Sequence, residues 1–180
     1  MLHVYTGDGK GKTTAALGLA VRAAAAGLPV AIIYFDKGFD GENEHYSERK
    51  LLRALPGVTL FPTGCERIMQ NGRFRFGVRP EDRAEAVRAL TLCEDVLRSR
   101  RYRLVVIDEI CSALTYKLIQ LDELMRIVEV YREVGGDVEL VMTGRGAPQE
   151  LIQAADLVTE MKQVKHYYET GVMAREGIDY

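Results

Sequence analysis

A glycine-rich turn near the start of the chain holds the residues best suited to chemistry. It reads Gly7-Asp8-Gly9-Lys10-Gly11-Lys12-Thr13-Thr14, and glycines let backbone N–H groups converge on phosphate oxygens in conformations that other residues resist. An apolar run precedes the turn and an alanine-rich run follows it, so a helix N-terminus should add its positive dipole. We expect all of these residues to contact a nucleotide, with Lys12 on its outer phosphates and the Thr13 hydroxyl on Mg²⁺. The alternative, a turn that only joins two elements, fits this context poorly.

The spacing of this turn departs from the usual P-loop in one respect. The usual pattern places four residues between its first glycine and the closing Gly-Lys-Thr, which would require glycine where this chain has Thr6. Counted from Gly7, the loop is one residue short. A shorter loop should seat the phosphates differently, so the geometry of an ordinary phosphate-cleaving enzyme does not follow from the motif.

Two further polar groups come directly after apolar strands. The run Leu104-Val105-Val106-Ile107 ends in Asp108-Glu109, and carboxylates beside a P-loop suit the hard cation Mg²⁺. The spacing does not say which acid touches the metal, and solvated acids at a strand end are the alternative. Thr143-Gly144-Arg145-Gly146-Ala147-Pro148 also follows a strand, which makes Arg145 a candidate phosphate or substrate ligand. A solvated arginine in a plain loop is the alternative there.

The segments around these motifs alternate between strand and helix. Apolar, β-branched runs predict strands over 2–6, 29–35, 58–61, 104–107, 138–142 and 157–161. Alanine-rich or amphipathic runs predict helices over 13–26, 49–55, 80–97, 121–131 and 148–154. The order indicates an α/β fold built around the P-loop, in which residues 1–180 form one domain. We expect a mostly parallel sheet of about six strands, helices on both faces, and ligands at the carboxyl ends of the strands.

Two glycine-containing stretches lack the regular spacing of apolar residues that predicts a helix or a strand. Residues 62–80 contain three glycines and four arginines, and we interpret them as a long functional loop. Residues 38–45 follow the second strand and could reach the site, although a solvated loop is the simpler interpretation. His3, His45 and His166 have no metal-ligand spacing.

Composition narrows the function classes. With 24 basic and 26 acidic residues the formal net charge is −2, so we expect neither nucleic acid nor a membrane as a partner. The P-loop begins at residue 7, which leaves no room for a signal peptide ahead of it. Three scattered cysteines without a CxxC pair indicate reduced thiols. We therefore expect a cytoplasmic protein.

At the level of whole motifs, the chain resembles the P-loop type of ATP:corrinoid adenosyltransferase, the cob(I)alamin and cob(I)yrinic acid a,c-diamide adenosyltransferase family. The resemblance rests on the short P-loop and its continuation into Ala15-Ala16, and on the strand that ends in Asp108-Glu109. It continues through the Arg145 loop and the run at 155–161, and it closes with Lys165-His166, the run at 171–174 and the tail at 177–180. The matching motifs occur in order over essentially the whole chain.

The resemblance implies an enzyme that transfers the 5′-deoxyadenosyl group of ATP to Co(I) of a reduced corrinoid and releases triphosphate. It implies a RecA-like P-loop fold in which ATP lies reversed relative to ordinary P-loop enzymes. It also implies that Lys12 acts in catalysis and that Thr13 and Glu109 ligate Mg²⁺. Asp8 stands where the family usually has Asn near the nucleoside. The implied partners are ATP, cob(I)alamin or cobyrinic acid a,c-diamide, an electron-donating reductase and a second copy of the chain in a homodimer.

One departure concerns the corrinoid. Family members carry two aromatic residues just after a Thr-Gly pair, whereas Thr63-Gly64 is followed here by 65–68 without an aromatic. Either Phe74 and Phe76 substitute from further along, or corrinoid activation differs. Two rival functions remain open at this stage: a P-loop ATPase or kinase that cleaves between phosphates, and a non-enzymatic nucleotide- or corrinoid-binding protein.

Overall fold

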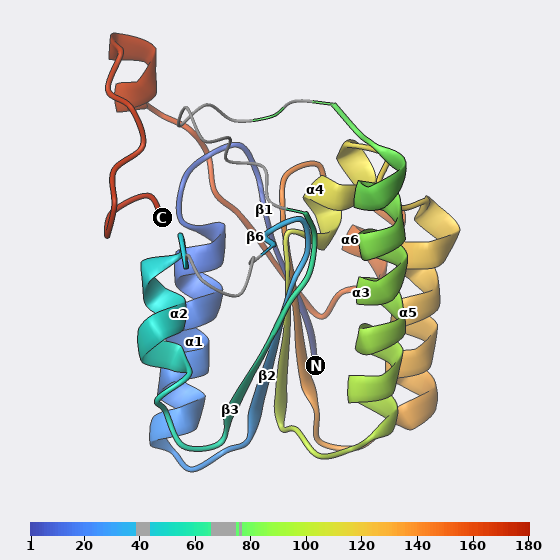
Figure 1. Cartoon of the computed structure of the whole chain (residues 1–180). Helices are drawn as coiled ribbons and strands as arrows, with labels where there is room; N and C mark the ends of the chain where they lie inside the picture. The colour runs from blue at the N-terminus through green and yellow to red at the C-terminus, as the bar shows by residue number, and fades with distance from the viewer. Residues whose placement is uncertain (39–43, 66–74, 76) are drawn as a thin grey trace.

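A six-stranded parallel sheet forms the centre of the molecule (Figure 1). The computed structural model describes residues 1–38, 44–65, 75 and 77–180. The strands lie in the order β3-β2-β4-β5-β1-β6. They are β1 (Leu2–Thr6), β2 (Val30–Tyr34), β3 (Val58–Pro62), β4 (Leu104–Asp108), β5 (Glu139–Thr143) and β6 (Leu157–Glu160). The α/β fold with a parallel sheet of about six strands is therefore confirmed.

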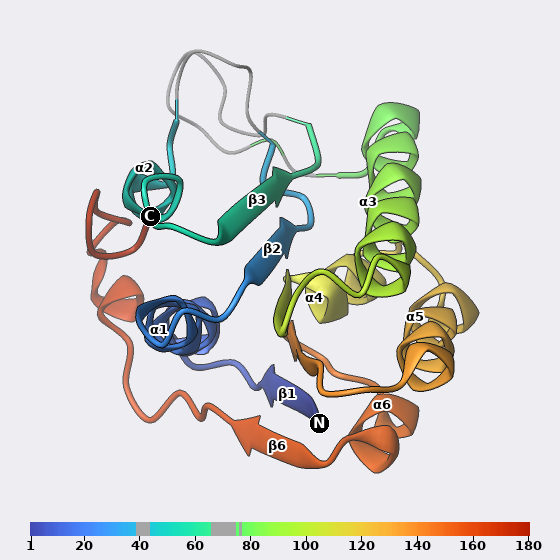
Figure 2. The ribbon, with the colours of Figure 1, turned by 90° about the horizontal axis from the view of Figure 1, so that it is seen from below.

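Helices cover both faces of this sheet, as Figure 2 shows from below. On one side lie α1 (Lys12–Ala25) and α2 (Ser47–Leu52). On the other lie α3 (Pro80–Arg98), α4 (Ile110–Thr115), α5 (Leu121–Val134) and α6 (Gln149–Ala154). A short 3-10 helix, η1 (Tyr167–Thr170), lies in the C-terminal segment beyond β6. The predicted arrangement with helices on both faces is confirmed.

Strand residues divide between two hydrophobic cores because side chains alternate along each strand. In β2, Val30 and Ile32 pack toward α1, whereas Ala31 and Ile33 join the larger core beneath α3 and α5. Every residue of β2 and of β4 is buried. This explains why these strands are continuous apolar runs in the sequence.

The sheet brings several carboxyl strand ends to one edge of the molecule. The P-loop follows β1, Lys37 follows β2, Glu109 follows β4 and Gly144 follows β5. In register, Tyr5 of β1 lies beside Thr143 of β5, and Tyr34 of β2 lies beside Asp108 of β4. Polar residues from four separate parts of the sequence therefore meet at one place.

Most predicted elements are present, with ends that differ by a few residues. The helix predicted over 13–26 runs from Lys12 to Ala25, and Pro80 begins α3 as its first residue. Two short helices were not predicted from the sequence: α4, which starts directly after Glu109, and η1. Much of the expected loops at 38–45 and 62–80, including Phe74 and Phe76, lies outside the described residues. Across the described residues, none of the helices combines the length and the apolar character that crossing a membrane requires.

Candidate nucleotide-binding site

The P-loop presents an open helix N-terminus. Gly11 is the N-cap of α1 with φ 118°, and Gly7 has φ 94°, a backbone region that favours glycine. Among the described residues no side chain caps the first turn of α1. The N–H groups of that turn, together with the helix dipole, are therefore available to an anion.

The P-loop rests on the chain that leaves β6. The Gly9 N–H donates to the Met161 carbonyl at 2.7 Å, so this amide is engaged with protein. A Cβ on Gly7 would lie 2.4 Å from the Met161 carbonyl oxygen, and one on Gly9 would lie 2.8 Å from it. Both glycines are required by this close approach of backbone to backbone.

This contact yields a stability prediction. Gly7→Ala should lower the free energy of unfolding by about 2 kcal/mol or more, since an L side chain at positive φ is strained and the new methyl group meets backbone. Gly27→Ala is the matched control, because Gly27 also has positive φ but nothing within 4 Å of an added Cβ. Urea unfolding of both variants measures the difference. Equal losses would show that the Met161 contact imposes no constraint.

Lys12 is held inside the loop it belongs to. The side chain is buried, and its Nζ donates to the carbonyl oxygens of Gly7 at 2.6 Å and Gly9 at 2.8 Å. Burial lowers the pKa of Lys12, and the nearby charge of Arg145 adds to the lowering. The ammonium group therefore lies inside the P-loop, and because it is already largely desolvated, it would lose little bound water when an anion binds.

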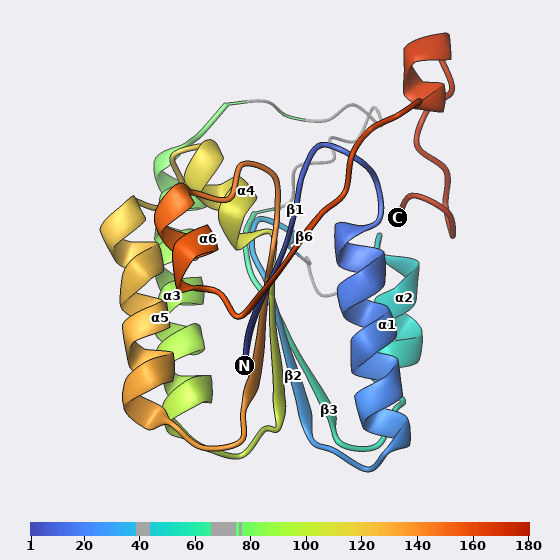
Figure 3. The ribbon, with the colours of Figure 1, turned by 180° about the vertical axis from the view of Figure 1, so that it is seen from behind.

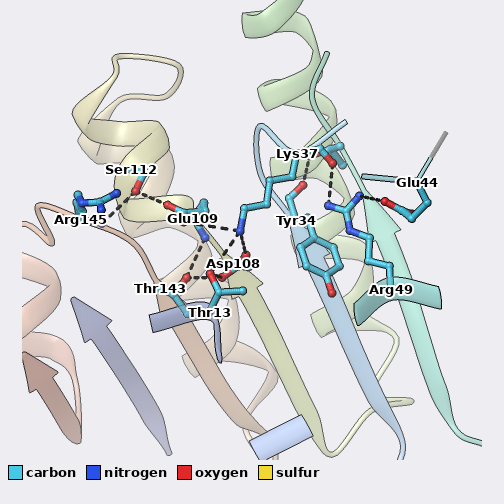
Figure 4. A network of polar contacts seen from close by, with 11 residues as sticks. Thr13, Tyr34, Lys37, Glu44, Arg49, Asp108, Glu109, Ser112, Thr143 and Arg145 are labelled. Carbon is cyan, nitrogen blue, oxygen red and sulfur yellow. Dashed lines mark hydrogen bonds and ion pairs between the residues drawn. The ribbon is translucent and has the colours of Figure 1, made fainter. Parts of the chain in front are cut away.

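Asp108 is the fully buried centre of a polar network (Figure 4). Its Oδ1 accepts from the hydroxyls of Thr13 at 2.9 Å and Thr143 at 2.6 Å, and its Oδ2 accepts from Lys37 Nζ at 2.6 Å. A buried carboxylate is stable only with such partners. Asp108 therefore fixes Thr13 and links the ends of β2, β4 and β5 to the P-loop.

Glu109 differs from its neighbour because it faces a cavity. It has φ 65°, its N–H donates to Thr143 Oγ1 at 3.0 Å, and the Ser112 hydroxyl donates to its carboxylate. Its side chain is 22% exposed, against 0% for Asp108. Of the two acids whose roles the spacing left open, Glu109 is therefore the one that an incoming ligand reaches.

Arg145 lies on the same cavity, and contacts with α4 set its position. Its backbone N–H donates to Ser112 Oγ at 3.0 Å, and its guanidinium donates to the Asp8 carbonyl at 3.4 Å. The preceding Gly144 has φ 135°, and a Cβ there would lie 2.6 Å from the Ser112 nitrogen. The Arg145 loop and the P-loop are thus in direct contact, as expected from adjacent strands.

A cavity of about 660 Å³ opens beside these groups, within the size range of small-molecule sites. The C-terminal segment closes one side: after β6 it passes the N-terminal end of α1 and ends near α1 and α2 (Figure 3). Lys10 Nζ lies 3.9 Å from Asp179 of this segment. The cavity is lined by residues of the P-loop, of α1 and α2, of the C-terminal segment and of the polar network around Asp108. They include Lys10, Gly11, Lys12, Thr13, Thr14, Lys37, Tyr46, Glu109, Arg145, Tyr167, Tyr168 and Asp179.

The structure brings together most residues that the sequence singled out. Lys10, Gly11, Lys12, Thr13, Thr14, Glu109 and Arg145 line one cavity. Gly7, Asp8 and Gly9 are not lining residues, but their carbonyl groups accept from Lys12 and Arg145, which are. Sequence reasoning missed Lys37, Ser112 and Met161. Lys37 had a usable signal, because it follows a buried parallel strand by three residues.

Comparison with known proteins agrees with this geometry. A family model described as ATP:corrinoid adenosyltransferase BtuR/CobO/CobP matches residues 1–180. A corrinoid adenosyltransferase of Sinorhizobium is 34% identical over 181 residues, which covers 100% of this chain and 80% of the relative. Corrinoid adenosyltransferases of Escherichia coli K12 and Salmonella typhimurium are each 33% identical, over 100% of this chain and 85% of the relative.

Proposed function

The chain belongs to the ATP:corrinoid adenosyltransferase family, and from this premise we propose which of its residues perform the reaction. It transfers the 5′-deoxyadenosyl group of ATP to Co(I) of a corrinoid and releases triphosphate. The observation that carries the proposal is the placement of Lys12, Thr13 and Glu109 on one cavity at the N-terminus of α1. A leaving polyphosphate needs cations and amides at that place.

The reaction is a displacement at carbon. The electron pair of Co(I) attacks the 5′ carbon of ATP, a Co–C bond forms, and the bond between that carbon and the phosphate oxygen breaks. Cobalt is formally oxidised to Co(III), and the bonding electrons leave with triphosphate. Negative charge therefore grows on the phosphates, where Lys12 and the first-turn amides of α1 stabilise it in the transition state.

A divalent cation fits the oxygen donors at this site. Thr13 offers a hydroxyl and Glu109 a carboxylate that faces the cavity, and hydroxyl and carboxylate oxygens are the ligands that Mg²⁺ prefers. We therefore assign Mg²⁺ to Thr13 and Glu109, with phosphate oxygens completing the set. Bound Mg²⁺ would neutralise charge on the leaving triphosphate. Asp108 holds the Thr13 side chain in place from behind.

The remaining candidate residues bind the rest of the nucleotide in this proposal. Gly7, Gly9, Gly11 and Thr14 shape the loop around the phosphates, and Lys10 and Arg145 add positive charge at its rim. Asp8, whose carbonyl accepts from Arg145, lies on the side assigned to the nucleoside. Its carboxylate can accept from ribose hydroxyls, whereas it cannot donate as an asparagine amide does.

We extend the proposal to partners and setting. The corrinoid is cob(I)alamin or cobyrinic acid a,c-diamide, and because Co(I) must be supplied, an electron-donating reductase acts with the enzyme. We assign a cytoplasmic location and a homodimer on the family relationship. The 180 residues form one domain in this proposal, since β1 and β6, from opposite ends of the chain, pair in the same sheet.

The test follows the products of both substrates. Protein, ATP, Mg²⁺ and chemically reduced cob(I)alamin are mixed, the Co–C bond is followed by its visible absorption, and the nucleotide products are separated. We expect alkylated corrinoid and triphosphate in equal amounts. Formation of ADP and orthophosphate without alkylated corrinoid would indicate a phosphate-cleaving enzyme and overturn the proposal. Parallel reactions without corrinoid give the background.

A further inference from the structure

Lys37 places an ammonium group among the oxygens of the polar network. Its Nζ lies 2.6 Å from Asp108 Oδ2, 3.3 Å from Thr13 Oγ1 and 3.7 Å from Glu109 Oε1 (Figure 4). The side chain is only 14% exposed. Its ion pair with the fully buried Asp108 carboxylate keeps this side chain as an ammonium group at this place.

Two of these three oxygens belong to the residues assigned to Mg²⁺. A monovalent ammonium group thus lies within contact distance of the donors that a divalent cation would need. A single and a double positive charge this close repel strongly where water is scarce. Either the metal stays out while Lys37 remains, or Lys37 moves when the metal arrives.

The surroundings allow the side chain of Lys37 to move while its backbone stays fixed. The Lys37 N–H donates to the Thr63 carbonyl at 2.9 Å, and its carbonyl accepts from Arg49 at 2.8 Å. The side chain beyond this anchor lines the cavity, and its Nζ lies 5.5 Å from the ring centroid of Tyr46, another lining residue. The ammonium can therefore turn from Asp108 into the cavity without disturbing the sheet.

We infer that Lys37 is the resident counter-ion of this site in the nucleotide-free protein and that it transfers to the triphosphate when a divalent cation enters with ATP. The inference rests on the cation site proposed above. Before ATP binds, Lys37 offsets one of the two carboxylate charges and occupies the space between them, so a free divalent cation finds less attraction there. ATP supplies both the metal and new negative charge for Lys37. Metal binding thereby becomes dependent on nucleotide, and Lys37 becomes a further ligand of the leaving group.

Binding of Mn²⁺ to the nucleotide-free protein, measured by the electron paramagnetic resonance signal of the free ion, tests this inference. Lys37→Met removes the charge and keeps the length of the side chain. We expect its Mn²⁺ affinity to exceed that of the wild type about tenfold or more, the scale of removing one close like charge. Lys50→Met, which removes an exposed lysine of α2, should bind Mn²⁺ as weakly as the wild type.

Two further variants make the result decisive. Lys37→Gln keeps a hydrogen-bond donor for Asp108 and should show the same gain if Lys37→Met does not fold. The double variant Lys37→Met with Glu109→Gln should lose the gain. Equal Mn²⁺ affinity in wild type and both Lys37 variants, or a gain that survives Glu109→Gln, would overturn the inference. Neither measurement uses corrinoid, so failure of adenosyl transfer would be recognised separately.

Discussion

Replacing Lys12 with alanine should lower kcat/KM for adenosyl transfer by about 10²- to 10³-fold, the range observed when one preorganised group that stabilises developing charge is removed. Lys12 is buried at the N-terminus of α1, and its Nζ donates to two carbonyl groups of its own loop. Because the whole triphosphate leaves, its negative charge increases in the transition state more than in bound ATP. The loss should therefore fall mainly on kcat and less on KM.

The measurement is a steady-state titration of ATP at saturating reduced corrinoid, followed by Co–C absorption. Lys50→Ala is the matched control, since it removes the same side chain from the exposed surface of α2, and its rate should stay within about twofold of the wild type. Urea unfolding of Lys12→Ala checks that the fold survives. A Lys12→Ala enzyme with wild-type kcat would remove Lys12 from the proposed role.

Local pattern was sufficient to predict the P-loop and the strands that flank it. Glycines at 7, 9 and 11 followed by Lys12 and Thr13 fix both a conformation and a charge, so the sequence alone predicts an anion site there. The buried strand β2 is apolar throughout, and β4 is apolar up to Asp108, which is the pattern of a parallel strand covered on both faces. Asp108 and the P-loop were both expected at the carboxyl ends of the strands, and Thr13 donates to Asp108 there.

What the sequence could not predict depends on contacts between distant segments. The Gly9 N–H is engaged by Met161, which is far along the chain and bonds through its backbone, so its side chain gives no signal. The choice between Asp108 and Glu109 depends on which carboxylate the fold buries. The short helix α4 is only six residues long, and its N-cap, Glu109, has a left-handed conformation, which no periodicity reveals. Lys37 carries a signal only when its strand is known to end at the site.

Arg49 supports the second prediction with a large effect, a loss of stability. Its side chain is fully buried, and its guanidinium lies 4.0 Å from the Tyr34 ring centroid and 4.4 Å from that of Tyr46. It also faces Glu44 Oε1 at 3.4 Å and donates to the Lys37 carbonyl at 2.8 Å. Arg49 thus ties α2 and the end of β2 together, and it fixes the backbone from which Lys37 reaches the polar network.

We expect Arg49→Met to lower the free energy of unfolding by about 3 kcal/mol, because it leaves the Lys37 carbonyl without this donor and removes the buried contacts of the guanidinium with two aromatic rings and with Glu44. Arg53→Met is the matched control: Arg53 also faces Glu44, at 2.8 Å, but its side chain is 40% exposed. That variant should lose no more than about 1 kcal/mol, as exposed pairs do. Urea unfolding monitored by tyrosine fluorescence and by circular dichroism measures both. If the two variants lose equal stability, burial of Arg49 contributes nothing beyond a surface pair, and the anchor that we assign to Lys37 would have to lie elsewhere.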